Sequence, residues 1–344
     1  MRARPERDGA WVRLDDATLV RVDRALARRL GVDGAALWDD TQPAPASAPL
    51  EVHVAVTSRC PVGCSGCYQS ATRDGEDVSR DDLATTLDAL ARAGVFTVAF
   101  GGGEPALRDD LGLVASMARA RGLVPVVTTS GLGVTRERAL SLGDFAQVNV
   151  SHDGVDGGYA SVRGVEGAGM ADRAITTLTR AGVRVGVNHV LTRDNVGRLV
   201  DTARHVRALG ACELQLLRYK PAGRAASVEY LARRLSPTQV EALGATLEAV
   251  AREHENAMSV RVDCALVPLL RGSIKDAGTL ARFGVFGCEA GRHLGAVRRD
   301  GSVAGCSFVG AHGAPGERDD FSAHWESDAS LRATRGYVES PPEP

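Results

Sequence analysis

Three cysteines lie close together in the chain, and their spacing could hold a metal cluster. Cys60, Cys64 and Cys67 are separated by three and then two residues. Three thiolates on one loop can wrap one face of a cubane iron–sulfur cluster, which four cysteines normally saturate. One iron would therefore be left open for a small-molecule ligand.

A zinc knot that borrows a fourth ligand from elsewhere is one alternative, and accidental clustering is another. A structural zinc site usually pairs two short cysteine or histidine hooks, and no second hook lies near this loop. A disulfide framework explains the seven cysteines poorly, because their number is odd and the N-terminus lacks the apolar stretch of an export signal. The triplet therefore favours the cluster.

The elements that must position this loop follow an alternating pattern from Glu51 onward. Short β-rich runs alternate with amphipathic helices, and two of these helices carry caps, at Ser79 and at the capping box Ser236-Pro237-Thr238-Gln239. Six strands are expected, at 51–57, 95–100, 123–128, 146–150, 184–190 and 212–217. Six βα units demand a parallel sheet, as a doubly wound sheet or an incomplete barrel, with the chemistry beyond the carboxyl ends of its strands.

The remainder of the chain divides into a leader and an appendage. Residues 1–49 are expected to hold an apolar-polar stretch (Trp11–Leu14), a helix (Asp16–Leu30) and a linker rich in proline and alanine. The barrel-like core is expected at 50–257. A smaller appendage at 258–344 is expected to contain short strands at 259–263, 293–298 and 302–308.

Composition excludes several classes of partner. The chain has 43 acidic and 41 basic side chains among 344 residues, so a polyanion such as nucleic acid is not expected to be its main partner. No apolar run is long enough for a transmembrane helix. We expect a globular protein without a membrane anchor and a cytoplasmic location.

The cysteine loop, placed directly after the first strand of the pattern, resembles that of the radical S-adenosylmethionine (SAM) superfamily. The resemblance implies a partial (β/α)6 TIM-like barrel and a [4Fe–4S] cluster whose open iron is chelated by SAM. It implies reductive cleavage of SAM to a 5′-deoxyadenosyl radical that abstracts a substrate hydrogen, with a reductase or flavodoxin-type protein as electron donor. One departure is Gly66, which stands where many members have an aromatic residue, whereas here Tyr68 follows the third cysteine.

The loops after the other strands resemble further superfamily motifs. Glycines followed by Glu104 resemble the segment that receives the SAM ammonium group, and Ser130 stands in a turn that usually carries asparagine. Ser151 and Arg163 resemble the residues that reach the SAM carboxylate, although a solvated surface arginine is an equal alternative. The implied cofactor contacts are Tyr68, Gly102, Gly103, Glu104, Pro105, Ser130, Ser151, Arg163, Asn188 and Leu191.

The loop after the sixth strand carries the cations Arg218, Lys220 and Arg224. They suggest an anionic or carboxylate-bearing substrate, with ordinary surface solvation as the alternative. No catalytic acid or base is singled out by the sequence. Asp153, Tyr159, His189 and Lys220 occupy plausible loops, and His189 could equally be a core histidine.

Cys288 and Cys306 resemble the opening of the SPASM/twitch extension, in which such cysteines begin an auxiliary iron–sulfur cluster. Phe321, Trp325, Leu331 and Arg332 resemble the linking helix of that extension. The chain stops at Pro341–Pro344, where further cysteines would be expected, so we expect either a shortened sequence or lost ligands. Cys264 is a spare thiol that could join the pair, although the spacing does not require it.

The resemblance implies an enzyme, and subgroup frequency favours a ribosomally made peptide as its substrate. A small molecule, such as a sugar or natural-product intermediate, is the alternative substrate. A leader of about fifty residues is short for a complete winged-helix peptide-recognition domain. A non-catalytic iron–sulfur protein and a zinc-dependent barrel enzyme are the competing classes.

Overall fold

The computed structural model describes residues 2–38, 46–227, 229–270, 272–274, 276–284, 287–309 and 318–339. Its main sheet has nine strands in the order β10-β9-β8-β7-β6-β5-β4-β11-β12. The six strands expected from the sequence are β4 (Glu51–Thr57), β5 (Thr97–Gly102), β6 (Val124–Thr129), β7 (Gln147–Ser151), β8 (Val185–Leu191) and β9 (Glu213–Arg218).

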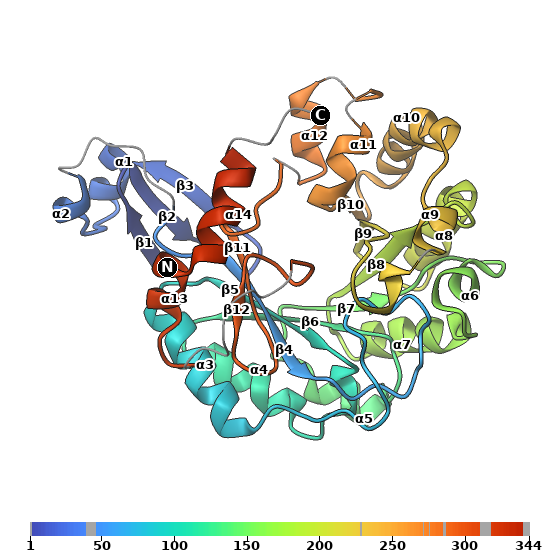
Figure 1. The fold of residues 1–344 in the computed structure, drawn as a ribbon, viewed down its shortest axis with the longest axis horizontal. Coiled ribbons are helices and arrows are strands. Elements are labelled where there is room, and N and C mark those ends of the chain that lie inside the picture. Colours follow the sequence, from blue (N-terminus) through green and yellow to red (C-terminus); the bar gives the residue numbers. More distant parts are fainter. Residues whose placement is uncertain are drawn as a thin grey trace.

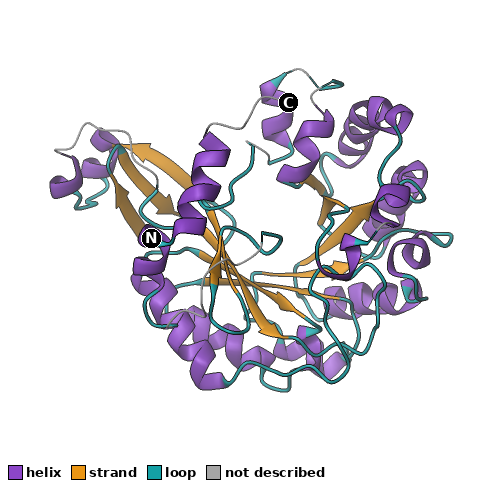
Figure 2. Ribbon diagram, viewed as in Figure 1, coloured by secondary structure: helices purple, strands orange, loops and turns teal. Residues whose placement is uncertain are grey.

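These six strands are parallel, and neighbours in the sheet are consecutive in the chain. A doubly wound sheet would reverse its strand order at a switch point. Here the order never reverses, and the helices lie around the outer side of the curved sheet (Figures 1 and 2). Of the two predicted architectures, the partial barrel is therefore the one observed.

Two of the helices on the outer side begin at the caps that the sequence predicts. Ser79 Oγ accepts from the Asp82 N–H at 3.0 Å, and Ser236 and Gln239 form a reciprocal capping box. The main barrel helices are α3 (Arg80–Arg92), α4 (Leu111–Ala120), α5 (Arg136–Ser141), α6 (Gly158–Arg163), α7 (Ala168–Arg180), α8 (Leu199–Ala208), α9 (Glu229–Arg233) and α10 (Pro237–His254).

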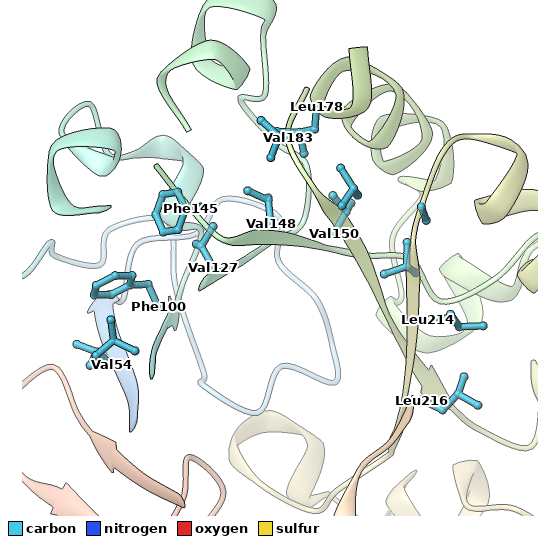
Figure 3. Close-up of a cluster of buried hydrophobic side chains, with 14 of the residues drawn as sticks. Val54, Phe100, Val127, Phe145, Val148, Val150, Leu178, Val183, Leu214 and Leu216 are labelled. Atoms are coloured by element: carbon cyan, nitrogen blue, oxygen red, sulfur yellow. The ribbon is translucent and has the colours of Figure 1, made fainter. Parts of the chain in front are cut away.

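The hydrophobic core fills the space between the sheet and these helices. Alternate strand residues such as Phe100, Val127 and Val148 point outward into it (Figure 3). Because strand side chains alternate, the residues between them face the lumen of the barrel. That alternation delivers Thr57, Thr128 and Ser151 to the inner side.

The N-terminal segment differs from its prediction. Strands β1 (Arg2–Glu6), β2 (Gly9–Arg13) and β3 (Leu19–Asp23) form an antiparallel sheet, followed by α1 (Arg24–Arg29) and α2 (Ala35–Trp38). The predicted helix over Asp16–Leu30 is wrong in its first half, which is β3.

Residues 19–23 form a strand because they pair with β2 and because Leu19, Val20 and Val22 favour an extended conformation. Asp23 then caps α1 by accepting from the Leu26 N–H at 2.7 Å. The segment is fastened to the barrel by Arg4, which donates to the carbonyl oxygens of Ala48 and Pro49 at 2.8 and 3.0 Å.

The segment after residue 258 extends the main sheet at both edges. β10 (Ser259–Val262) pairs in parallel with β9, β11 (Leu294–Val297) pairs in parallel with β4, and β12 (Val303–Ala304) is antiparallel to β11. The helices of this segment are α11 (Val267–Leu270), α12 (Ala277–Arg282), α13 (Phe321–Ser327) and α14 (Ala329–Glu339).

Phe321, Trp325 and Leu331 of the predicted linking helix are buried. The predicted domain boundaries stay predictions, and Pro341–Pro344 lie outside the described residues. Within the described part of the chain, no helix is both long and apolar enough to cross a membrane.

Candidate functional site

A cavity of about 1900 Å³ occupies the lumen of the barrel. Its lining includes the carboxyl ends of the strands and also their amino ends, where the turn between β2 and β3 contributes Asp15, Asp16 and Ala17. The sequence-predicted site residues that line it are Cys60, Cys64, Cys67, Tyr68, Gly102, Gly103, Glu104, Ser130, Ser151, Arg163 and Asn188. Pro105 and Leu191 are buried, and they are not among the described residues of the lining.

The cysteine loop follows β4 and is bonded back to a neighbouring segment. The Cys60 N–H donates to Thr72 O at 2.7 Å, and all three thiols are free. Burial raises the pKa of the Cys60 thiol, and the nearby charges of Glu104, Cys64 and Cys67 raise it further. Cys64 and Cys67 are therefore close enough to disfavour ionisation of the Cys60 thiol, and a metal cluster would remove that penalty by ligating the thiolate.

Arg224 holds this loop in place. Its Nε and Nη2 donate to Cys64 O at 3.1 and 3.0 Å, and its Nη1 donates to Ala71 O at 2.8 Å. Its backbone N–H donates to Cys67 O at 2.9 Å. The sequence suggested an anionic substrate for this arginine, whereas the structure uses its donors on the backbone of the cysteine loop.

The other cations of that strand end also have partners within the chain. Arg218 donates to Ala265 O at 3.2 Å, and Lys220 forms an ion pair with Asp263. The Lys220 Nζ also lies 4.0 Å from the centroid of the Phe308 ring. Neither solvation nor an anionic ligand is needed to explain these residues.

Glu104 is a buried carboxylate at the carboxyl end of β5, with 1% of its surface exposed. It accepts from Thr129 Oγ1 at 2.6 Å, from the N–H of Ser130 at 2.7 Å and from that of Ala106 at 3.0 Å, and also from Ser130 Oγ. Burial raises its pKa, although these hydrogen bonds act in the opposite direction. A cation in the cavity would offset the cost of burying its charge.

Gly102 and Gly103 let β5 approach the cysteine loop. A Cβ added to Gly102 would lie 2.2 Å from Thr57 O, and one added to Gly103 would lie 2.3 Å from Arg59 O. Gly102 also has a φ of +119°, which disfavours a side chain. Close backbone packing and a positive φ are both present at Gly102.

Arg163 connects the loop after β7 to the cysteine loop. Its Nε donates to the buried Asp153 Oδ2 at 2.6 Å, and its Nη1 lies 3.8 Å from Cys64 Sγ. Burial alone would lower its pKa, but the negative charges of Asp153, Tyr159 and Cys64, together with the hydrogen bond to Asp153, outweigh that effect and raise it. Asp153, which the sequence left without a role, therefore orients Arg163 beside the cysteines.

Asn188 presents an unused acceptor on the cavity wall. Its Nδ2 donates to Thr128 Oγ1 at 3.3 Å, while its buried Oδ1 has no hydrogen-bond partner among the described residues. A buried acceptor without a donor is costly, so a ligand hydroxyl or amine there would be stabilising. His189 bonds through Nδ1 to His152 O at 2.9 Å, and its Nε2 also lacks a partner among the described residues, but it does not line the described cavity.

A second cysteine group forms from three separate segments. The Cys264 and Cys288 thiols hydrogen-bond to one another, which lowers the pKa of Cys288 to about 6 and raises that of Cys264. Burial is the main cause that raises the pKa of the Cys306 thiol. The negative charge of a nearby Cys288 thiolate raises it further, so Cys306 lies close to Cys288. The sequence named Cys288 and Cys306 for an auxiliary site, and the structure adds Cys264.

An aromatic contact lies between the two cysteine groups. Tyr68, directly after Cys67, stacks on Phe308 with ring centroids 4.5 Å apart. Phe308 lies two residues after Cys306, so the stacked rings link the cysteine loop to the C-terminal segment.

Comparisons with known proteins agree with this geometry. The model of the Radical SAM superfamily matches residues 54–206. The mycofactocin maturase MftC of Mycobacterium ulcerans (strain Agy99) is 32% identical over 267 residues, covering 76% of this chain and 69% of the relative. The PqqA peptide cyclase of Rhodopseudomonas palustris (strain ATCC BAA-98 / CGA009) is 34% identical over 216 residues, covering 60% of this chain and 55% of the relative. Among the mycofactocin maturases that it matches, the aligned part of the chain covers between 47% and 69% of the relative's length.

Solved structures share the fold at low sequence identity. Streptococcus suis SuiB bound to S-adenosylmethionine has a TM-score of 0.73 and 13% identity, covering 97% of this chain and 89% of that one. Native anSMEcpe with bound AdoMet and the Cp18Cys peptide has a TM-score of 0.62 and 18% identity, covering 83% of this chain and 82% of that one.

Proposed function

This chain belongs to the radical SAM superfamily, and we propose that it is an enzyme that modifies a peptide by hydrogen abstraction in the barrel lumen. The observation that carries the proposal is the joint lining of one cavity by Cys60, Cys64 and Cys67 and by the buried carboxylate of Glu104. The thiols and the carboxylate converge from consecutive strands, at the end of the sheet where barrel enzymes do their chemistry.

The residues of the cavity fit the family's cofactors. When bound, a [4Fe–4S] cluster with SAM supplies the electron and the 5′-deoxyadenosyl group that together abstract a substrate hydrogen. Cys60, Cys64 and Cys67 would hold the cluster and leave one iron open. Arg224 fixes the loop that carries these thiols.

The cavity offers matching partners for the ends of SAM. Glu104 would bind the ammonium group, because a cation relieves the cost of its buried charge. Arg163, held by Asp153, would bind the carboxylate group, and Asn188 Oδ1 would accept from a hydroxyl or amine. Ser130 and Ser151 add polar groups on the same wall.

A peptide substrate is supported by the size of the cavity and by the relatives. Ligand pockets usually measure about 300–1000 Å³, so a cavity of about 1900 Å³ leaves room for a substrate segment beside SAM. The relatives are named as a maturase and a peptide cyclase, and one structural neighbour was solved with its precursor peptide. Of the described residues, only β2 pairs with β3, so the outer edge of β3 could also accept an extended peptide.

Cys264, Cys288 and Cys306 would hold an auxiliary iron–sulfur cluster. Their thiols approach one another from three segments, and the lowered pKa of Cys288 favours the thiolate that binds iron. Two cubane clusters would bring about eight irons to each reconstituted chain. No more than four irons per chain would contradict the auxiliary cluster while leaving the main proposal standing.

The test is SAM cleavage by the anaerobically reconstituted protein. Reduced with dithionite and given SAM, the protein should form 5′-deoxyadenosine, and a peptide encoded beside its gene should change in mass. Cys64→Ala should abolish 5′-deoxyadenosine formation, because the cluster loses a ligand. Cys212→Ala is the matched control, since that thiol bonds to Val185 O away from the cysteine loop.

Formation of 5′-deoxyadenosine by Cys64→Ala at the unaltered rate would overturn the assignment. If SAM cleavage depends on a small molecule and no peptide is modified, the radical chemistry stands but the peptide substrate is wrong. A colourless protein that contains zinc would refute both.

A further inference from the structure

A second set of metal-ligating side chains lies on the outer side of the barrel. His152 follows β7, Asp172 lies on α7, and His205 lies on α8. Both helices cover the outer side of the sheet (Figure 1), and the three residues are absent from the described lining of the lumen. The proposed radical chemistry uses none of them.

The three side chains converge on one point. Asp172 Oδ1 lies 2.9 Å from His152 Nε2 and 2.9 Å from His205 Nε2. All three ligand atoms lie within 4.8 Å of one another. Ligand atoms around tetrahedral zinc stand about 3.3 Å apart, so small side-chain shifts would place an ion between them.

We propose that His152, Asp172 and His205 bind one divalent transition-metal ion. Two imidazoles and a carboxylate suit zinc, cobalt, nickel or ferrous iron, whereas magnesium and calcium prefer oxygen ligands. His152 is fully buried, but the side chains of Asp172 and His205 are 29% and 36% exposed. The ion can therefore enter from solvent and complete its coordination with water.

Metal binding requires a proton to move on His152. In the metal-free protein the Gly154 N–H donates to His152 Nδ1 at 3.3 Å, so the ring proton sits on Nε2 and is donated to Asp172. The ion takes the place of that proton, which moves to Nδ1, and the long contact with Gly154 is given up. No proton is gained or lost by this ring in the exchange.

The site would act on the cavity through the loop that follows β7. His152 directly precedes Asp153, the residue that orients Arg163. An ion that ties His152 to α7 and α8 would fix the start of this loop, so we expect metal occupancy to restrict the position of Asp153. The role is structural or regulatory, since the trio lies outside the lumen.

The test uses the cluster-loaded, oxidised protein with cobalt(II) as the probe, because the cysteines are then occupied and the cluster is diamagnetic. Wild-type protein should bind one cobalt ion per chain, and pulsed electron paramagnetic resonance should detect nitrogen modulation from coordinated imidazole. Asp172→Asn and His205→Gln should each lose that binding. Asp201→Asn, at an exposed acid on the same helix as His205, is the matched control and should retain it.

A second measurement is thermal unfolding with and without zinc. Zinc should raise the unfolding midpoint of the wild type and of Asp201→Asn, and leave the other two variants unchanged, because a ligand stabilises only the state that binds it. Absence of cobalt binding, cobalt without imidazole nitrogen, or equal binding by Asp172→Asn would each overturn the proposal. None of these outcomes bears on SAM cleavage, which is measured separately.

Discussion

The two cysteine groups of this protein are built in opposite ways. Cys60, Cys64 and Cys67 lie on a single loop, whereas the members of the second group follow β10, precede β11 and follow β12. The first group lies within eight consecutive residues, so its geometry depends on one loop, which Arg224 holds by hydrogen bonds to its backbone. The second exists because β10 joins β9 and β11 joins β4, so sheet pairing brings distant thiols together.

The largest expected effect is a difference in activity between a variant of the first cysteine group and a variant of the second. Cys64→Ala should remove both 5′-deoxyadenosine formation and peptide modification. Cys288→Ala should still form 5′-deoxyadenosine but lose the peptide product and about four irons per chain, because the second group lies outside the described cavity lining. Iron analysis and product chromatography measure the difference, and loss of SAM cleavage in both variants would show that the groups are not independent.

Arg224 offers the next largest effect, on the first group alone. Arg224→Met should lower the free energy of unfolding by about 1–3 kcal/mol, because the carbonyls of Cys64 and Ala71 lose their donors. The cluster should also be lost faster under a chelator, as absorbance at visible wavelengths would follow. Arg204→Met is the control, since within the described part of the chain Arg204 forms its ion pairs with the exposed acids Asp201 and Glu253. Equal behaviour of the two variants would remove Arg224 from this role.

A pH titration of SAM binding tests Glu104. Its pKa lies above the ordinary value of 4.5, and the ammonium group of SAM should bind only the ionised carboxylate. Affinity should therefore fall as the pH drops through that raised pKa. The folding stability of the ligand-free protein should show the opposite dependence. Glu104 should contribute more stability as the pH falls, because its carboxyl group binds a proton more tightly in the folded state than in the unfolded state. Calorimetry on Glu104→Gln should show weak binding that no longer depends on this titration.

The smallest expected effect concerns the contact between the two groups. Phe308→Leu removes the ring that stacks on Tyr68, a contact worth about 1 kcal/mol, so SAM cleavage should persist with a slightly lower unfolding midpoint. Leu113→Ala, at an exposed site on α4, provides a comparison for loss of surface apolar area. A complete loss of the first cluster in Phe308→Leu would mean that the groups assemble as one unit.

The sequence predicts those parts of the fold that depend on local patterns. The six barrel strands lie within two residues of their expected positions, and the caps at Ser79 and Ser236 are confirmed. The strand expected at 302–308 is wrong in its extent, because only Val303–Ala304 pairs with β11. Residue type and spacing determine these features. The helix predicted from Asp16 fails because Leu19–Asp23 pairs with β2, and strand pairing depends on residues that lie elsewhere in the chain.

The same distinction holds for the candidate site. The sequence predicts the triplet from its spacing and Glu104 from its resemblance to a superfamily segment, and the structure places them in one cavity. The role of Arg224 cannot be predicted from local spacing, because the carbonyl of Cys64 that it binds lies 160 residues earlier in the chain. The contact of Cys264 with Cys288 depends in the same way on distant segments, although the position of Cys264 directly after an expected strand is a usable signal.

The turn between β2 and β3 brings the N-terminal segment to the wall of the cavity. Asp15 and Asp16 line the same cavity as the cysteine loop, and Asp16 is tied to Arg119 at the amino end of the barrel by a 2.6 Å ion pair. The turn therefore lies at the amino end of the lumen, opposite the cysteine loop. Without this segment the amino end of the lumen would be more open to solvent, and dissolved oxygen could reach a radical from that side.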